Sequence, residues 1–228
     1  MAWQAHDGGS AFDDTSLVAY YKLGDALDSS GSGFNLTGVN TPTYVQGLFA
    51  NCANLLLASD QCFYVASDLG ITSGAYTIVL WFLTNSATGR LVRLNDAGTK
   101  ISTDIYFSAT TVYTERLDDV WRSATYTYVV PQGIWHNLIM TFTGANIFQY
   151  FNGSQTATIA ASGTSAPNAT VDKMALGNAF VSSNGNLYTG ISLNGKFDEC
   201  LFFTRAWTAA ECALYYARNC QQYGVAHP

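Results

Sequence analysis

Short strand-like segments recur along almost the whole chain, and turn-forming residues separate them. Residues 76–83 read Tyr-Thr-Ile-Val-Leu-Trp-Phe-Leu, a run of β-branched and aromatic side chains of strand length. Residues 147–151 are of the same kind and end at Asn152-Gly153, a strong turn signal. About a dozen such segments at even spacing predict an all-β fold, a two-sheet antiparallel β-sandwich of the jelly-roll type. Within this pattern, residues 55–57 and 62–65 predict a hairpin around residues 58–61.

A single short helix is predicted, close to the C-terminus. Thr208-Ala-Ala-Glu211 is a capping box in which Thr208 is the N-cap and Glu211 the N3 residue. We expect the helix to run to about Arg218, whose charge suits the C-terminal end of a helix. Neither a repeat nor a linker divides the chain, so we predict one sandwich domain over residues 16–228, preceded by an N-terminal arm over residues 1–15.

Charged residues are scarce, and acids outnumber bases. The chain has 10 Lys and Arg against 16 Asp and Glu, a formal net charge of −6, and 11% of its 228 residues are charged. A nucleic-acid-binding domain usually carries a basic patch, so this balance argues against such a partner. The first ten residues lack the basic and apolar regions of a signal peptide, and no apolar run approaches the roughly 20 residues of a membrane span. We therefore expect neither nucleic acid nor a membrane as a partner.

The five cysteines form neither a CxxC pair nor a Cys/His cluster with zinc spacing. Two interpretations are open for them. Cys52 and Cys62 could be bridged across neighbouring strands, or all five thiols could be reduced and mostly buried. The second interpretation suits synthesis in a reducing cytoplasm and is the one we predict.

Six sequence blocks follow one another in a characteristic order. They are Leu17-Val-Ala-Tyr-Tyr-Lys-Leu-Gly with the Asp28-Ser-Ser-Gly turn, Thr77-Ile-Val-Leu-Trp-Phe, Gly133-Ile-Trp-His-Asn-Leu-Ile, Phe148-Gln-Tyr-Phe-Asn-Gly, Ala175-Leu-Gly, and Gly195-Lys-Phe-Asp-Glu with the segment that leads into the capping box. Together they resemble the LamG-like (laminin G-like) domains of the concanavalin A-like lectin/glucanase superfamily, over about residues 17–217. Cys200 and Trp207 depart from the aliphatic residues usual there. The resemblance implies a jelly roll that binds glycans or proteins, or that serves as a structural module.

The resemblance also implies a structural calcium ion between the first strand and the last one. In such a jelly roll these two strands are neighbours, which would bring Asp25 or Asp28 close to Asp198 and Glu199. Calcium takes roughly six to eight oxygen ligands, so Asp28 and Asp198, with loop carbonyls from residues 29–33, are the candidate metal ligands. The alternative is that Asp28 holds its own turn through backbone hydrogen bonds and that Asp198 fixes a strand end in the same way.

Residues 115–122, Glu-Arg-Leu-Asp-Asp-Val-Trp-Arg, form the one charge-rich stretch of a charge-poor chain. A planar aromatic ring packs on the apolar face of a sugar, and flanking Asp and Arg side chains bond its hydroxyl groups. A loop of this kind therefore suits ligand contact. The candidate ligand-binding residues are Trp121, Asp118, Asp119 and Arg122. The alternative is a hairpin whose charges solvate its turn while Trp121 covers a local gap.

The other aromatic residues are assigned mainly to packing. Trp81 and Trp135 fall in strands that the resemblance places in the core, and Trp207 occupies the position of a core leucine. Four tyrosines on the strands beside the charge-rich stretch could line the same face as that stretch, although alternating tyrosines more often pack within a sheet. They are Tyr106, Tyr113, Tyr126 and Tyr128.

Candidate catalytic acids are few. Glycosidases of this general fold carry Glu-x-Asp-x-x-Glu on one strand, and no such run occurs here. General acid–base chemistry on a sugar needs two carboxyl groups that face one bond. Glu211 is used in the capping box, Glu115 has no second glutamate nearby, and Glu199 has only Asp198 beside it. We therefore predict that the protein is not an enzyme.

Together these features predict a non-catalytic carbohydrate-binding or structural module. The lack of a leader, the reduced thiols and the bare domain favour a virion protein, such as a bacteriophage capsid decoration or tail-fibre protein. It would be made in the host cytoplasm and would contact glycans or other virion proteins. Two alternatives stay open: an extracellular glycan-binding domain of a larger secreted or cell-surface bacterial protein, and a glycoside hydrolase or lyase. An exposed sheet edge or a Tyr-rich face would support a homo-oligomer.

Overall fold

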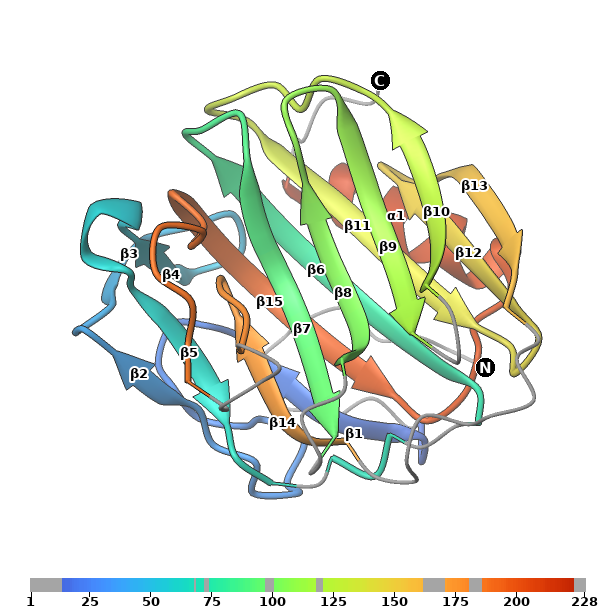
Figure 1. Cartoon of the computed structure of the whole chain (residues 1–228), viewed down its shortest axis with the longest axis horizontal. Coiled ribbons are helices and arrows are strands. Elements are labelled where there is room, and N and C mark those ends of the chain that lie inside the picture. The colour runs from blue at the N-terminus through green and yellow to red at the C-terminus, as the bar shows by residue number, and fades with distance from the viewer. Residues whose placement is uncertain are drawn as a thin grey trace.

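The computed structural model describes residues 14–67, 69–71, 74–96, 101–117, 121–161, 171–180 and 186–223. These residues form two antiparallel sheets that lie face to face (Figure 1), which confirms the predicted β-sandwich. Sheet A has the order β13 (Ser154–Ala160), β12 (Asn146–Phe151), β11 (Trp135–Phe142), β6 (Tyr76–Thr84), β15 (Gly195–Phe203), β4 (Asn51–Leu55) and β3 (Thr43–Gln46), and β1 (Leu17–Tyr21) also pairs with β15. Sheet B has the order β10 (Trp121–Thr127), β9 (Thr111–Leu117), β8 (Ile101–Phe107), β7 (Gly89–Asp96), β14 (Val171–Leu176), β5 (Cys62–Val65) and β2 (Thr37–Val39).

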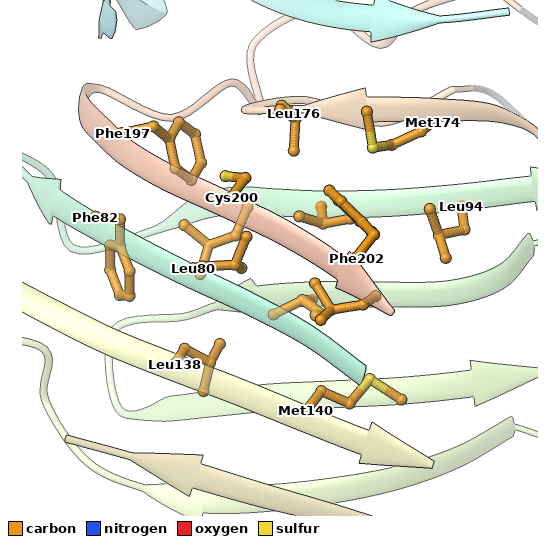
Figure 2. Close-up of a cluster of buried hydrophobic side chains, with 14 of the residues drawn as sticks. Leu80, Phe82, Leu94, Leu138, Met140, Met174, Leu176, Phe197, Cys200 and Phe202 are labelled. Atoms are coloured by element: carbon orange, nitrogen blue, oxygen red, sulfur yellow. The ribbon is translucent and has the colours of Figure 1, made fainter. Parts of the chain in front are cut away.

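The main core lies between the two sheets (Figure 2). Successive side chains of a strand point to opposite faces, so every second residue of the central strands enters this space. Leu80 and Phe82 of β6 and Phe202 of β15 meet Leu94 of β7 and Met174 of β14, and each is at most 2% exposed. Burial of one such side chain stabilises the fold by about 1.5–3 kcal/mol.

The predicted hairpin over residues 55–65 is wrong. β4 belongs to sheet A and β5 to sheet B, and a short 3-10 turn, Leu57–Ser59, carries the chain from one sheet to the other. Cys52 and Cys62 therefore lie in different sheets, and all five cysteines are free and buried. The prediction of reduced, buried thiols is confirmed.

Helix α1 (Ala209–Tyr223) covers the outer face of sheet A. The Trp81 ring of β6 stacks on Tyr216 of the helix with a centroid distance of 5.8 Å, and Trp207 is 2% exposed in the same cluster. The central strands of sheet A are therefore buried on both faces, which explains why β6 and β15 are nearly continuous apolar runs. Among the described residues, no helix has the length and apolar character to cross a bilayer.

The capping box is confirmed. The backbone N–H of Thr208 donates to Glu211 at 2.7 Å, and the backbone N–H of Glu211 donates to the Thr208 hydroxyl at 3.3 Å. The predicted end at Arg218 is wrong, because the helix continues to Tyr223 and has no basic residue in its last turn. Buried Cys220, 2% exposed in the cluster beneath the helix, gives this extra turn a reason to form.

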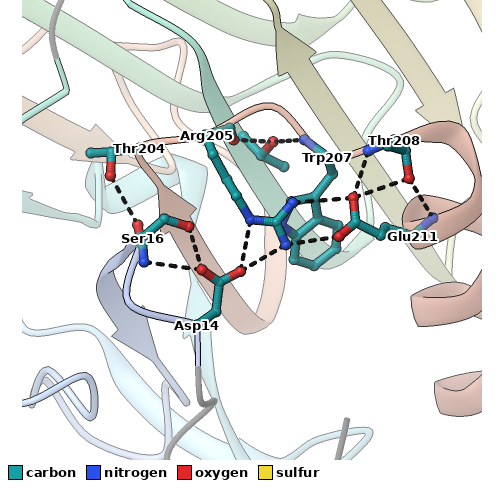
Figure 3. A network of polar contacts seen from close by, with 8 residues as sticks. Asp14, Ser16, Thr204, Arg205, Trp207, Thr208 and Glu211 are labelled. Carbon is teal, nitrogen blue, oxygen red and sulfur yellow. Dashed lines mark hydrogen bonds and ion pairs between the residues drawn. The ribbon is translucent and has the colours of Figure 1, made fainter. Parts of the chain in front are cut away.

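Arg205 joins the start of the described chain to the helix (Figure 3). Its Nη2 lies 2.7 Å from Asp14 Oδ2 and 2.8 Å from Glu211 Oε1. Burial acts to raise the pKa of Asp14, but hydrogen bonds from Arg205 and Ser16 outweigh it, so the pKa is lowered. Residues 1–13 of the predicted N-terminal arm lie outside the described residues.

Candidate functional site

The outer face of sheet B is not covered by the helix, and it carries polar and aromatic side chains. Val92, Leu94, Ile105 and Phe107 point into the core, so the residues that alternate with them face outward. The register of β7 shifts between Arg90 and Val92, which places Arg90 opposite the outward residue Tyr106. These outward residues form two rows across β7, β8, β9 and β10. One row is Arg90, Tyr106, Tyr113 and Thr125, and the other is Arg93, Asp104, Glu115 and Ser123.

The first row is a stack of flat groups. The Tyr106 and Tyr113 rings are nearly parallel, with an interplanar angle of 6° and a centroid distance of 4.5 Å. The Arg90 guanidinium lies over the Tyr106 ring, 4.1 Å from its centroid. Both faces of the Tyr106 ring are thus occupied. On the far side of Tyr113 the cross-strand neighbour is Thr125, a small and exposed residue of the edge strand β10.

The second row is a charge network at the base of the stack. Arg90 and Arg93 both donate to the same oxygen, Oδ2, of Asp104, and Asp104 is 1% exposed. The Tyr106 hydroxyl donates to Glu115 Oε1 at 3.2 Å. Burial and then the neighbouring Arg90 charge lower the pKa of Arg93 to about 10, whereas burial and Glu115 raise the pKa of Tyr106 to about 12.

Four buried polar atoms of this face have no hydrogen-bond partner among the described residues. They are Asp104 Oδ1, Arg93 Nε, Asn95 Oδ1 and Ser123 Oγ. Asp104, Arg93 and Asn95 are 1%, 4% and 2% exposed. Buried polar groups are normally hydrogen-bonded, and an unpaired one costs about 1–3 kcal/mol. Together with the stacked tyrosines beside them, these atoms single out the outer face of sheet B as the candidate site.

The segment between β14 and β15 flanks the Arg93 side of this face. Arg93 Nη1 donates to the Phe180 carbonyl at 3.1 Å, and its guanidinium lies 5.7 Å from the Tyr188 ring centroid. Gly177 starts the segment with a φ of +80°, and a Cβ there would overlap the Leu55 side chain. Glycine is therefore the residue that lets this segment fold back over the sheet.

The predicted ligand-binding residues are only partly described. Asp118 and Asp119 lie outside the described residues, as does the side chain of Trp121, whose backbone begins β10 opposite Leu117. Arg122 pairs with Arg116, which is 2% exposed, and alternates in phase with buried Ala124. It therefore occupies the strand face that turns toward sheet A, whereas Ser123 and Thr125 alternate with it and face outward.

The four tyrosines named from the sequence divide into two pairs. Tyr106 and Tyr113 belong to the stack on the outer face. Tyr126 and Tyr128 stack on each other with a centroid distance of 5.2 Å and pack against Phe151 of sheet A, so they serve the core.

Asp28 is held by hydrogen bonds within its own turn. Oδ1 accepts the backbone N–H groups of Tyr20 and Ser30, at 3.0 and 2.9 Å. Oδ2 accepts the Ser30 hydroxyl at 2.9 Å and the Phe34 N–H at 3.1 Å. Each oxygen therefore accepts two hydrogen bonds from the protein, as the turn-capping alternative predicted.

Asp198 and Glu199 lie at a bulge in β15, beneath the helix side of sheet A, and β15 pairs with β1 as the jelly-roll resemblance implies. Asp198 Oδ2 accepts the N–H groups of Leu48 and Phe49, at 2.6 and 2.9 Å. Glu199 is 2% exposed, and burial raises the pKa of each acid to about 7.

Among the described residues no three His, Cys, Asp or Glu side chains gather as a metal site. The structural calcium ion between the first and last strands stays a prediction.

Sequence reasoning missed Arg90, Arg93 and Asp104. The signal was present as charged residues at outward positions of two strand-like runs, Arg-Leu-Val-Arg-Leu and Thr-Asp-Ile-Tyr-Phe. A charge inside such a run marks the face that does not enter the core. Which of the two sheets would keep an uncovered outer face was not readable from these runs.

The family follows from sequence. Residues 58–213 match the profile of the concanavalin A-like lectin/glucanases superfamily. The chain belongs to this superfamily. The match covers more than half of the protein, including β5 to β15 and the first turn of α1, so the LamG-like resemblance is confirmed. No curated protein sequence matches the chain.

Solved structures share the fold at low sequence identity. Domain 4 of AbnA, a GH43 extracellular arabinanase from Geobacillus stearothermophilus in complex with arabinotriose, has a TM-score of 0.71 and 18% identity over 87% of this chain and 97% of its own. The binding domain of Paraclostridial Mosquitocidal Protein 1 has a TM-score of 0.71 and 13% identity over 88% of this chain. The binding domain of Botulinum Neurotoxin DC in complex with SialylT has a TM-score of 0.70 and 10% identity over 90% of this chain. The chain spans 52% of the length of each toxin domain.

Proposed function

We propose that the protein is a non-catalytic glycan-binding module whose ligand lies on the outer face of sheet B. The observation that carries the proposal is the Tyr113 ring, which is stacked on one face by Tyr106 and borders the small, exposed Thr125 on the other. A sugar ring stacked on that open face would extend the row of flat groups by one member. Glu115, two residues along the same strand face, would bond its hydroxyls.

Two of the structural relatives support the choice of ligand class. The arabinanase domain is described in complex with arabinotriose, and one toxin binding domain in complex with SialylT. For this chain the support comes from its own residues. Asp104 holds the guanidinium groups of Arg90 and Arg93 in place, and the stacked Tyr113 ring lies beside them. Such a combination of an apolar surface and a few fixed polar groups is what small-molecule sites share.

The test is a glycan array followed by calorimetric titration of the native protein and the Tyr113→Ala variant. Loss of an aromatic contact of about 1 kcal/mol predicts roughly fivefold weaker binding, and Tyr113→Phe should restore it. Tyr44→Ala is the matched control, because Tyr44 is a 39% exposed tyrosine on β3 of sheet A. Equal affinity of the Tyr113→Ala variant and the native protein would place the ligand elsewhere.

The charge-rich stretch remains a second candidate contact on this module. Trp121 starts the edge strand β10, two residues before Ser123 of the charge row. If the predicted loop of Trp121, Asp118 and Asp119 contributes, Trp121→Ala should weaken glycan binding in the same titration. Unchanged affinity would remove this loop from the site.

We propose that the protein is not an enzyme, because of where its acidic side chains lie. Glu199 is 2% exposed beneath the helix side of sheet A, and Glu211 is bonded to Thr208 and Arg205, so neither can face a glycosidic bond in the open. Asp104, the acid nearest to Glu115 in its row, is held by two arginines. Incubation with the oligosaccharides that bind should release no products. Hydrolysis that Glu115→Gln abolishes would overturn this part.

The virion setting is the remaining part of the proposal. The five buried free thiols support synthesis in a reducing compartment, which agrees with a phage decoration or tail protein made in a host cytoplasm. Detection of the chain in purified particles by mass spectrometry would support this setting. Recovery of the chain only as a part of a larger secreted protein would favour the extracellular alternative.

A further inference from the structure

We infer that the outer face of sheet B selects neutral sugars over acidic ones, an inference that rests on the proposed glycan-binding function. It concerns the four charged side chains of the two rows, Arg90, Arg93, Asp104 and Glu115. Two of them are cationic, and both cations are already engaged.

The two guanidinium groups are committed to the protein. Both donate to Asp104 Oδ2, Arg90 also lies against the Tyr106 ring, and Arg93 also donates to the Phe180 carbonyl. The side chain of Arg93 is 5% exposed. Recognition of a sugar carboxylate by arginine needs a free fork of two N–H donors. Arg93 is too buried to offer one, and Arg90, whose side chain is 24% exposed, lies against the Tyr106 ring, so Tyr106 and Tyr113 stand between it and a sugar on the open face of Tyr113.

The remaining bonding capacity of the face is mainly that of an acceptor. Asp104 Oδ1 and Asn95 Oδ1 have no partner among the described residues, and Glu115 is half-buried with one oxygen bonded by Tyr106. Of these oxygens, those of Glu115 are the ones that a bound sugar can reach; a sugar hydroxyl group can donate to them, whereas a carboxylate has no proton to donate. Arg93 Nε and the Ser123 hydroxyl are the buried donors of this face that have no partner among the described residues.

Charge acts in the same direction. Glu115 lies in the row next to Tyr113, so a carboxylate on a sugar stacked there would meet a like charge at close range. Lys173 is a further cation on the described part of sheet B, but it stands on β14, three strands from β9. Three strand spacings are about 14 Å, beyond the Debye length of about 8 Å in physiological salt.

The test uses pairs of oligosaccharides that differ by an acidic group. Galactotriose with trigalacturonate, and lactose with sialyllactose, are titrated into the native protein and into Glu115→Gln. The native protein should bind the neutral member at least about tenfold more tightly. Glu115→Gln should reduce that ratio several-fold by gaining affinity for the acidic member. Asp25→Asn is the matched control, because it removes an acid from a turn of the same chain, and it should leave the ratio unchanged.

The outcomes separate the inference from the proposed function. Tighter binding of the acidic members, or an unchanged ratio in a folded Glu115→Gln variant, would overturn the selectivity and leave the glycan site in place. If Glu115→Gln does not fold, the native protein still decides: added salt should strengthen binding of the acidic members and leave that of the neutral ones unchanged. Absence of binding to every glycan would overturn the proposed function, and the inference with it.

Discussion

The buried acid Glu199 makes the stability of the fold depend on pH in an unusual direction. Its two carboxyl oxygens accept the hydroxyls of Tyr20, at 2.6 Å, and Tyr215, at 3.2 Å, and the indole N–H of Trp81 donates in turn to Tyr215 at 3.2 Å. Burial raises the pKa of Glu199 from 4.5 to about 7, although the two tyrosine hydroxyls act against it. Between pH 4.5 and about 7, Glu199 of the folded protein therefore keeps a proton that Glu199 of the unfolded chain has lost.

The sign and size of the effect follow from these two values. The contribution of Glu199 is fully present below pH 4.5 and is lost as the pH rises to about 7. At ~1.4 kcal/mol for each pH unit between the two values, the loss is about 3 kcal/mol. Asp198, whose pKa is also raised to about 7, acts in the same direction. His136 acts in the opposite direction below pH 6.5, because burial lowers its pKa.

Glu199→Gln isolates the effect, because glutamine keeps the shape and an acceptor oxygen but does not titrate. Urea unfolding at a series of pH values between about 5 and 8, followed by tryptophan fluorescence, should show the variant gaining about 3 kcal/mol relative to the native protein as the pH rises. Tyr215→Phe removes one donor to the carboxylate, so its decline in stability should extend to higher pH. A constant difference between Glu199→Gln and the native protein across this range would refute the reasoning.

Three further substitutions test the packing and the turns. Gly47→Ala should lower the free energy of unfolding in urea by about 1–3 kcal/mol, because the added Cβ would stand 2.5 Å from Cys52 Cβ and against Asp198 Oδ2. An unchanged free energy of unfolding would show that the turn can move aside. Asp28→Ala should lower the free energy of unfolding by about 2–4 kcal/mol, because four donors lose their acceptor, and the loss should be the same with calcium and with a chelator. A chelator that lowers the melting temperature of the native protein would instead support the predicted calcium ion. Phe82→Ala should cost about 3–5 kcal/mol, because its ring is fully buried between the sheets, and native-like stability would contradict that packing.

Local signals carried most of the fold prediction. The capping box needs only two residues three positions apart, and the alternation of side chains along a strand needs only the strand itself, so both were readable. The pairing of β1 with β15 came from the family resemblance. The turn at Leu57–Ser59 was misread because a hairpin and a crossing between sheets differ in distant partners, not in local sequence.

The candidate site was harder to predict for the same reason. Arg93, Asp104 and Glu115 become neighbours only through the register of three strands, which no local pattern specifies. The sequence marked Tyr106 and Tyr113 as aromatic, but their separation from Tyr126 and Tyr128 depends on which face of these strands turns toward sheet A.

The central place of β15 also bears on how the chain can fold during synthesis. Gly195–Phe203 is made after all the other described strands, yet it pairs with β6, β4 and β1, whose residues precede it by more than a hundred positions. Until it emerges, sheet A lacks its middle strand, and the helix that covers that sheet has no complete surface to pack on. Pairings across such long loops are slow to form, so a nascent or truncated chain would leave strand edges open to aggregation and in need of chaperones.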